Sequence, residues 1–218
     1  MDKWIDKNTF LSLLKDGQSM MVGGFMTCGT PEQLIDWVVE SKVNDLTIIC
    51  NDAGYPDAGV GKLIKNRQVK RLIASHIGLN PYAGEQMSDG ELDVILVPQG
   101  TLAEQIRAHG AGLGGILTPT GLGTIVEEGK EIIRVNDKDF ILETALGADL
   151  ALIQIESCDV LGNAVYAKTA RNFNPVMATA CKTVVALTNH RVESIDPEII
   201  VTPHVLIDYI VKEEDNAS

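Results

Sequence analysis

Positive charge, aromatic residues and long hydrophobic runs are all scarce in this sequence. Its 18 Lys and Arg residues are outnumbered by 30 Asp and Glu residues, and the formal net charge of -12 at pH 7 disfavours nonspecific binding to nucleic acid. No apolar run approaches the roughly 18 residues that a membrane-spanning helix needs. Residues 1–6 mix charged and apolar side chains and lack the basic start and apolar stretch of a secretory signal. We therefore expect a cytoplasmic protein without a membrane or nucleic-acid partner.

Cysteine is also sparse, and no metal-binding pattern is present. The four cysteines form no C-x-x-C pair and, with four scattered histidines, predict no metal site. We expect Cys50 and Cys181 to be buried free thiols. Cys28 is expected to have a structural role, because no histidine or other base lies near it in the sequence. A P-loop motif, G-x-x-x-x-G-K-[ST], is absent, which leaves a phosphate-gripping loop of that kind unsupported.

The sequence does contain a series of short apolar segments separated by helical patterns. Its 218 residues can bury a single core, and we assign residues 1–212 to one domain and residues 213–218 to a disordered polar tail. Short apolar runs rich in Ile and Val lie at 20–22, 46–50, 69–74, 92–97, 150–155 and 183–187. Several of them are apolar almost throughout, as expected for strands covered on both faces. With helices expected at 8–15, 31–40, 101–108 and 175–180, the pattern predicts an α/β fold with a mostly parallel open sheet flanked by helices.

Two segments depart from this alternation. Residues 110–123 contain six glycines and a proline, which disfavours regular structure and predicts a long irregular loop. After it, residues 131–135 and 140–142 flank a polar turn at 136–139, and this spacing predicts an inserted β-hairpin.

The most informative segment is 16–31. It runs from a polar turn through an apolar strand into the paired glycines Gly23 and Gly24, and Gly29 and Pro31 open the helix that follows. Paired glycines at the carboxyl end of a strand let the backbone approach a ligand closely, and the free N–H groups of a helix start favour an anion. The glycine spacing at 23–29 does not match the dinucleotide fingerprint G-x-G-x-x-G.

Two further polar segments follow predicted strands. Asn51-Asp52 comes directly after the strand at 46–50, and Pro98-Gln99-Gly100 follows the strand at 92–97. In a parallel sheet the carboxyl ends of neighbouring strands lie at one edge, where ligands bind. We therefore expect these segments and the glycine segment to form one site.

The same segments carry a resemblance to a known family. The pattern in 16–31 is Asp-Gly, two free positions, three apolar residues, Gly-Gly-Phe, three free positions, Gly, one free position and Pro. It closely resembles the signature of the alpha subunit of the two-subunit, family I 3-oxoacid coenzyme A (CoA) transferases. Later segments resemble the same family in the same order, so the resemblance covers nearly the whole chain; they are 51–52, 97–107, 112–124, 170–175 and 201–203.

This resemblance implies a CoA-transferase-like fold and an activity shared with a partner chain. In the family, an active-site glutamate attacks the acyl-CoA carbonyl, a glutamyl-CoA thioester forms, and an acceptor carboxylate completes the exchange. The glutamate belongs to a Glu-Asn-Gly type motif of the beta subunit, and no such motif occurs in this sequence. The resemblance therefore implies a heterotetramer of two alpha and two beta subunits, with CoA as a substrate and no permanently bound cofactor.

The resemblance also assigns candidate site residues. It places CoA contact on seven consecutive residues, which are Gly23, Gly24, Phe25, Met26, Thr27, Cys28 and Gly29. Gln99 matches a family glutamine that faces the acyl site, where its N–H₂ group would orient a substrate carboxylate or stabilise an oxyanion. Asn51 and Gly100 are further substrate-site candidates. Judged from the residues alone, Gln99 would more simply satisfy the backbone of a turn.

Within the family, residues 51–63 and 75–81 look most similar to enzymes acting on acetate, butyrate and acetoacetate. The expected thioesters are therefore acetoacetyl-CoA, butyryl-CoA or acetyl-CoA. The alternatives are a self-sufficient sugar-phosphate isomerase-like enzyme of related fold and a non-catalytic binding or assembly protein.

Because the net charge opposes the phosphates of CoA, we expect the partner subunit to supply most of the positive contacts. His109 departs from the glycine usual at that point in the family, and residues 171–175 are interpreted as a subunit contact or a structural corner.

Overall fold

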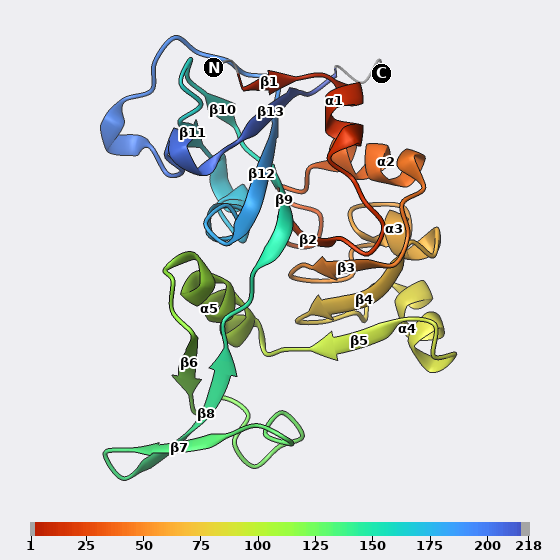
Figure 1. Cartoon of the computed structure of the whole chain (residues 1–218), viewed down its shortest axis with the longest axis vertical. Coiled ribbons are helices and arrows are strands. Elements are labelled where there is room, and N and C mark those ends of the chain that lie inside the picture. Colours follow the sequence, from red (N-terminus) through yellow and green to blue (C-terminus); the bar gives the residue numbers. More distant parts are fainter. Residues whose placement is uncertain (1–2, 215–218) are drawn as a thin grey trace.

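A parallel sheet of eight strands forms the centre of the molecule (Figure 1). The computed structural model describes residues 3–214. The strand order is β1-β13-β12-β9-β2-β3-β4-β5, and all neighbouring strands are parallel. The strands are β1 (Trp4–Ile5), β2 (Ser19–Val22), β3 (Leu46–Ile49), β4 (Val69–Ala74), β5 (Asp93–Leu96), β9 (Ala148–Gln154), β12 (Cys181–Thr188) and β13 (Tyr209–Lys212). This confirms the α/β fold, and the order reverses between β2 and β9, which makes the carboxyl ends of these strands a ligand crevice.

The central strands are largely apolar because their alternate side chains enter two separate cores. On one face, Met20 of β2 lies beside Ile48 of β3, and both are fully buried. On the other face, the neighbouring pair is Met21 and Ile49. Full burial of each such side chain contributes roughly 1.5–3 kcal/mol, so these strands are fixed by both layers of helices.

Helices cover both faces of the sheet (Figure 1). The first core packs against α1 (Lys7–Ser12), α2 (Glu32–Ser41), α3 (Gly61–Lys65) and α4 (Pro81–Ser88), and the second packs against α5 (Gln99–Gly110) and α6 (Asn174–Met177). Some of the predicted helix ends were wrong: α1 and α6 each end three residues earlier than expected, and α5 extends two residues further at both ends. The helices α3 and α4 were not predicted, because α3 has only five residues and α4 is marked mainly by the Asn80 cap, whose side chain accepts a hydrogen bond from Tyr82 N.

A small antiparallel sheet projects from the body below α5 (Figure 1). It consists of β6 (Gly115–Thr118), β7 (Ile132–Val135) and β8 (Lys138–Thr144), in the order β6-β8-β7. The predicted inserted hairpin is confirmed as β7 and β8, whose turn residues Asn136 and Asp137 have φ values of 49° and 59°. The expectation of a wholly irregular loop at 110–123 was wrong, because Gly115 to Thr118 pair with β8 as β6.

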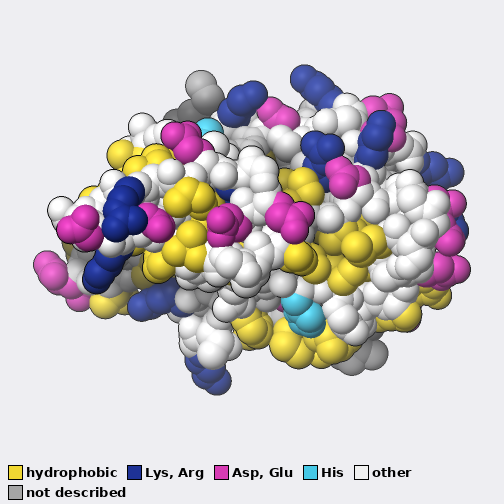
Figure 2. All heavy atoms as spheres, turned by 90° about the horizontal axis from the view of Figure 1, so that it is seen from below, with side chains coloured by type: hydrophobic (Ala, Val, Ile, Leu, Met, Phe, Trp, Pro, Cys, Tyr) yellow, Lys and Arg dark blue, Asp and Glu magenta, His cyan; other side chains and the backbone are white. Residues whose placement is uncertain are grey.

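The projecting sheet is tied to α5 through one buried carboxylate. Glu143 of β8 accepts hydrogen bonds from Gln105 Nε2 of α5 at 3.2 Å and from Lys130 Nζ at 2.6 Å. Figure 2 views the molecule from this side and shows hydrophobic side chains exposed among charged ones. Large exposed hydrophobic residues of this region are Leu113, Leu117, Ile125, Ile132 and Val135.

Short elements complete the chain at its carboxyl end. They are β10 (Ser157–Cys158), β11 (Ala164–Val165) and the 3-10 helices at Lys168–Ala170, Pro197–Ile199 and His204–Leu206. We expected a disordered tail over 213–218, but Glu213 N donates to Thr188 O and Glu214 N donates to the side chain of Gln33. Residues 215–218 lie outside the described part of the chain. No helix within residues 3–214 is long and apolar enough to cross a membrane.

Candidate functional site

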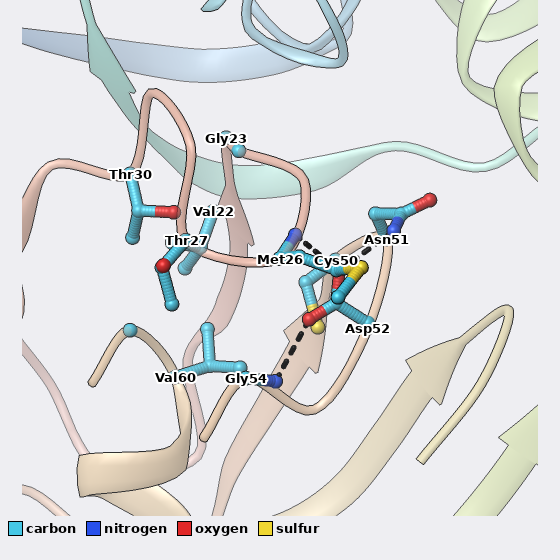
Figure 3. A pocket seen from close by; sticks show the side chains of 12 residues that line it. Val22, Gly23, Met26, Thr27, Thr30, Cys50, Asn51, Asp52, Gly54 and Val60 are labelled. Atoms are coloured by element: carbon cyan, nitrogen blue, oxygen red, sulfur yellow. Dashed lines mark hydrogen bonds between the residues drawn. The ribbon is translucent and has the colours of Figure 1, made fainter. Parts of the chain in front are cut away.

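The three polar segments expected at one edge of the sheet do meet there. Gln99, at the start of α5 after β5, donates through Nε2 to Asn51 Oδ1 at 2.6 Å. Met26 N, in the segment that follows β2, donates to Asp52 Oδ2 at 2.8 Å. Figure 3 shows the bond between Met26 N and Asp52. Together with the bond from Gln99 to Asn51, it joins the segments after β2, β3 and β5 directly. This arrangement builds one continuous hydrogen-bonded network beside the β2–β9 crevice.

The glycine segment is a tight hairpin. Phe25 and Cys28 exchange both backbone hydrogen bonds, with N to O distances of 3.1 and 2.9 Å. The two residues between them, Met26 and Thr27, have φ values of 45° and 69°, as in a type I′ turn, although neither is glycine. We call residues 23–29 the glycine hairpin. Its backbone is held in one shape by this turn and by the bond from Met26 N to Asp52.

The glycines of this hairpin are required by its packing. A Cβ atom added at Gly23 would overlap the side-chain oxygen of Asn174, and one added at Gly24, where φ is 120°, would overlap Thr30 Oγ1. The space for a side chain at these two positions is therefore filled by protein atoms. At Gly100, by contrast, an added Cβ would meet nothing within 4 Å.

Asn174 was not identified as a key residue from the sequence. Its side chain is fully buried; Oδ1 accepts from Gln154 N at 3.0 Å, and Nδ2 donates to Gly29 O at 2.8 Å and Ala170 O at 3.0 Å. One amide therefore joins the end of β9, the glycine hairpin and the start of α6. This favours the structural-corner interpretation of residues 171–175, and the Asn-Pro pair before a helix was the available signal.

A polar network lies beneath the glycine hairpin. Asn51 Nδ2 donates to Asp52 Oδ2 at 2.6 Å, and Gly54 N donates to Asp52 Oδ1 at 3.0 Å (Figure 3). Asn51 is 2% exposed and Asp52 is 6% exposed. Asn51 was a candidate for substrate contact, and the structure places its amide between Gln99 and Asp52. Gln99 itself is exposed.

The start of α5 differs from the sequence-based expectation. We expected Gln99 and Gly100 in a turn before a helix at 101–108, but both lie in the first turn of α5, after Pro98 as the N-cap. Proline fixes φ and gives the chain a defined entry into the helix. Gln99 therefore projects from a regular element, which holds a functional side chain more firmly than a loop does.

Two hollows of very different size adjoin the network. The small cavity under the glycine hairpin, drawn in Figure 3, has a volume of about 10 Å³, enough for one water molecule. A groove of about 290 Å³ lies on the other side of Gln99. Its lining includes Phe25, Gln99, Gly100, Arg107, Phe173 and Val176. The groove is the space in which a substrate group can meet both the glycine hairpin and the Gln99 carboxamide.

The charged and nucleophilic side chains around the site are mostly engaged. Burial, followed by the negative charge of Asp52, raises the pKa of the Cys50 thiol well above its ordinary value, so Cys50 is a neutral buried thiol. Cys28 is exposed, and its Sγ lies 3.0 Å from Thr169 Oγ1. Arg107 pairs with Glu104 one helical turn earlier, at 3.1 Å. Within residues 3–214, no group of three or more His, Cys, Asp and Glu side chains is arranged to hold a metal ion.

Other residues singled out in the sequence lie outside this network. The ring of His109 occupies the space that a side chain at residue 147 would fill, so His109 packs on Gly147. Cys158 and Cys181 are free thiols, and burial raises the pKa of Cys158 to about 11 and that of Cys181 to about 12. Cys50 and Cys158 are buried, and Cys181 is half-buried.

Known proteins with similar sequences are coenzyme A transferases. The family model described as "Coenzyme A transferase" matches residues 7–213. The acetoacetyl-CoA:acetate/butyrate CoA transferase alpha subunit of Clostridium acetobutylicum is 53% identical over 204 residues, which are 93% of this chain and 94% of that protein. The acetate CoA-transferase subunit alpha of Escherichia coli K12 is 52% identical over 204 residues, with 93% of each chain covered.

A solved structure shares the fold. An acyl-CoA transferase from Escherichia coli O157:H7, in a thioester complex with CoA, superposes with a TM-score of 0.90 at 20% sequence identity. The match covers 99% of this chain and 48% of that one, so this chain spans about half the length of that enzyme. At this level of identity the likeness concerns the fold.

Proposed function

Because the chain belongs to the coenzyme A transferase family, we propose that it is the alpha subunit of an enzyme exchanging CoA between a short-chain acyl-CoA and a free carboxylate. The proposed thioesters are acetoacetyl-CoA, butyryl-CoA and acetyl-CoA, in keeping with the substrates in the names of the two relatives. The isomerase-like and non-catalytic alternatives are not favoured, because relatives at 50–53% identity are named as CoA-transferase subunits.

The observation that supports a nucleophile on another subunit is the hydrogen bonding of Asp52. This buried carboxylate receives hydrogen bonds from Met26 N, Gly54 N and the Asn51 amide, so its oxygens are occupied and covered. A nucleophilic carboxylate must reach the thioester carbonyl with a free oxygen. Asp52 is therefore not available as the nucleophile. Because this sequence also lacks the Glu-Asn-Gly motif, we assign the attacking glutamate, and with it the glutamyl-CoA thioester, to the beta subunit.

The residues of this chain hold and polarise the substrates. The glycine hairpin offers a rigid backbone edge to CoA, and the groove beside it takes the group being transferred. Gln99 stands between them, where an N–H of its carboxamide can donate to the oxyanion that develops at the carbonyl carbon. Preorganised donors of this kind need no rearrangement at the moment of reaction, which is the source of their effect on rate.

The partner subunit is supported by exposed apolar surface as well as by the names of the relatives. Edge strand β5 exposes Ile95 and Leu96. The projecting sheet exposes Leu117, Ile132 and Val135, and the loops beside it expose Leu113 and Ile125. Large hydrophobic side chains that are open to solvent on a folded chain favour a contact with another molecule. The assembly we propose contains two alpha and two beta subunits in the cytoplasm, and the beta subunit supplies most of the cations that meet the CoA phosphates.

Coexpression separates the possible functions. The chain is purified alone and with a beta subunit that carries the Glu-Asn-Gly motif, and exchange between acetoacetyl-CoA and acetate is measured. We expect turnover only when both subunits are present. Full turnover by the isolated chain would contradict the proposal, and sugar-phosphate isomerisation by the isolated chain would favour the isomerase alternative. Binding of CoA without turnover in every combination would favour a non-catalytic role.

A further inference from the structure

The two hydrogen bonds that link Asp52, Asn51 and Gln99, which we call the relay, have a fixed direction. The carboxylate oxygens of Asp52 accept from two backbone N–H groups, and the Asn51 atom that faces them is Nδ2, which donates at 2.6 Å. Asn51 Oδ1 then points away from Asp52 and can only accept. It lies 2.6 Å from Gln99 Nε2, so Gln99 must present its N–H₂ to it. Reversing either amide would set two oxygens against each other.

This direction determines what Gln99 offers to the groove. One N–H of the Gln99 carboxamide is used by Asn51, which leaves the second N–H and Oε1 in fixed positions. Without the relay, the carboxamide of an exposed glutamine could rotate and exchange its donor and acceptor ends. An oxyanion requires the donor, so every orientation that presents Oε1 instead would be unproductive.

We propose that Asp52 is a positioning residue that acts through Asn51 to fix the orientation of the Gln99 carboxamide; this rests on the proposed transferase function. The burial of the network supports the assignment. Asn51 and Asp52 are 2% and 6% exposed, and in such surroundings an amide that faced a carboxylate with its oxygen would be strongly disfavoured. The relay therefore has one stable polarity.

Asp52 also has a second, separable role. Its oxygens accept from Met26 N in the glycine hairpin and from Gly54 N in the segment after β3, at 2.8 and 3.0 Å. These bonds hold the backbone edge proposed for CoA and do not involve Gln99. Removing the carboxylate should consequently lower kcat through Gln99 and raise the KM for the CoA thioester through the glycine hairpin.

A set of variants in the assembled enzyme tests the proposal. We expect Asp52→Asn to lower kcat roughly tenfold when Gln99 is present, which is less than complete loss of an oxyanion donor costs, and to raise the KM for acetoacetyl-CoA. In a Gln99→Ala background, the further loss of kcat on Asp52→Asn should be less than about twofold, whereas the rise in KM should persist. Asp57→Asn, which removes an exposed carboxylate that pairs with Lys65, serves as the matched control.

A second variant keeps the test valid if Asp52→Asn fails to assemble. Asn51→Ala breaks the relay and leaves the bonds from Asp52 to Met26 and Gly54 in place, so kcat should fall only when Gln99 is present and KM should stay unchanged. The same fold-decrease of kcat in the wild-type and Gln99→Ala backgrounds, for either variant, would overturn the proposal. In that outcome the wild-type enzyme still exchanges CoA; absence of exchange by the wild-type assembly would instead count against the proposed function.

Discussion

At the scale of single residues, the site depends on side-chain amides that lie between backbone segments. Asn174 joins β9, the glycine hairpin and α6, and Asn51 joins Asp52 to Gln99. An amide carries both donors and an acceptor, so one side chain can satisfy segments of opposite polarity. Such residues have no periodicity in the sequence. That Gln99 and Asn51 lie close together could be predicted because both follow strands, whereas their proposed roles come from the family resemblance. The contacts of Asn174 depend on segments that are distant in the sequence.

Replacing Gln99 tests its proposed role as a donor. We expect Gln99→Ala to slow CoA exchange by about 10²–10³-fold, on the order of 3 kcal/mol of transition-state stabilisation, because the donor to the oxyanion is lost. Assembly should be unchanged, since Gln99 is exposed, and size-exclusion chromatography with the beta subunit measures it. An unaltered turnover rate would remove Gln99 from the active site.

Replacing Gly23 tests the packing of the hairpin against Asn174. We expect Gly23→Ala to destabilise the fold by about 1–3 kcal/mol, because the added methyl group overlaps the Asn174 side chain. Gly84→Ala is the matched control: Gly84 lies in α4 with nothing within 4 Å of an added Cβ, so this change should stabilise by about 0.5–1 kcal/mol. Urea unfolding of both variants measures the difference, and equal stabilities would contradict the packing argument.

At the scale of elements, most of the strands that could be predicted from the sequence are buried on both faces. The segments that became β2, β3 and β9 are largely apolar, as expected for a covered parallel sheet. The predicted strands β4 and β5 are less covered: β4 carries the exposed Lys70 and Arg71, and three of the four residues of β5 are exposed. By contrast, β1 contains two residues, and β6 lies in a glycine-rich segment and pairs only because β8 comes beside it. Their existence depends on tertiary contacts, and no local pattern indicates it.

The glycine hairpin can be tested as an element. Gly24→Val places a β-branched side chain at a φ of 120° and against Thr30, and we expect the distorted hairpin to raise the KM for acyl-CoA roughly tenfold or more. Gly17→Val is the control, because Gly17 also has a positive φ, 71°, but an added Cβ there meets nothing within 4 Å. The KM for acyl-CoA is measured by steady-state kinetics for both assembled variants. Gly17→Val reports the effect of backbone strain away from the site, and Gly24→Val reports the effect of strain within the glycine hairpin. If Gly17→Val raises KM as much as Gly24→Val does, the hairpin has no special part in CoA use.

At the scale of the whole molecule, an ionic contact joins three central strands at the end opposite the site. Asp149 of β9 accepts from Ser19 N and Oγ of β2 and from Lys182 Nζ of β12. The hydrogen bond from Lys182, followed by those from Ser19, lowers the pKa of Asp149 from 3.8 to about 2. A carboxyl group with a lowered pKa stabilises the folded state above its unfolded pKa and loses that effect as pH falls.

This contact predicts part of the acid sensitivity of the fold. Stability should decline as pH is lowered from about 4 to about 2, and Asp149→Asn should flatten that part of the profile. Thermal unfolding of the wild type and the variant at a series of pH values measures the effect. Parallel profiles for the two proteins would show that Asp149 does not contribute.

The sheet also joins the beginning of the chain to its end. β1, at residues 4–5, is hydrogen-bonded to β13, at residues 209–212, and β9 lies between β2 and β12. On the ribosome, the earliest strand therefore has no neighbour until residue 212 has been synthesised and has left the exit tunnel. Until then, the sheet presents a bare row of N–H and C=O groups where that last strand will sit. The nascent polypeptide is thus prone to mispairing at this position until β13 has emerged.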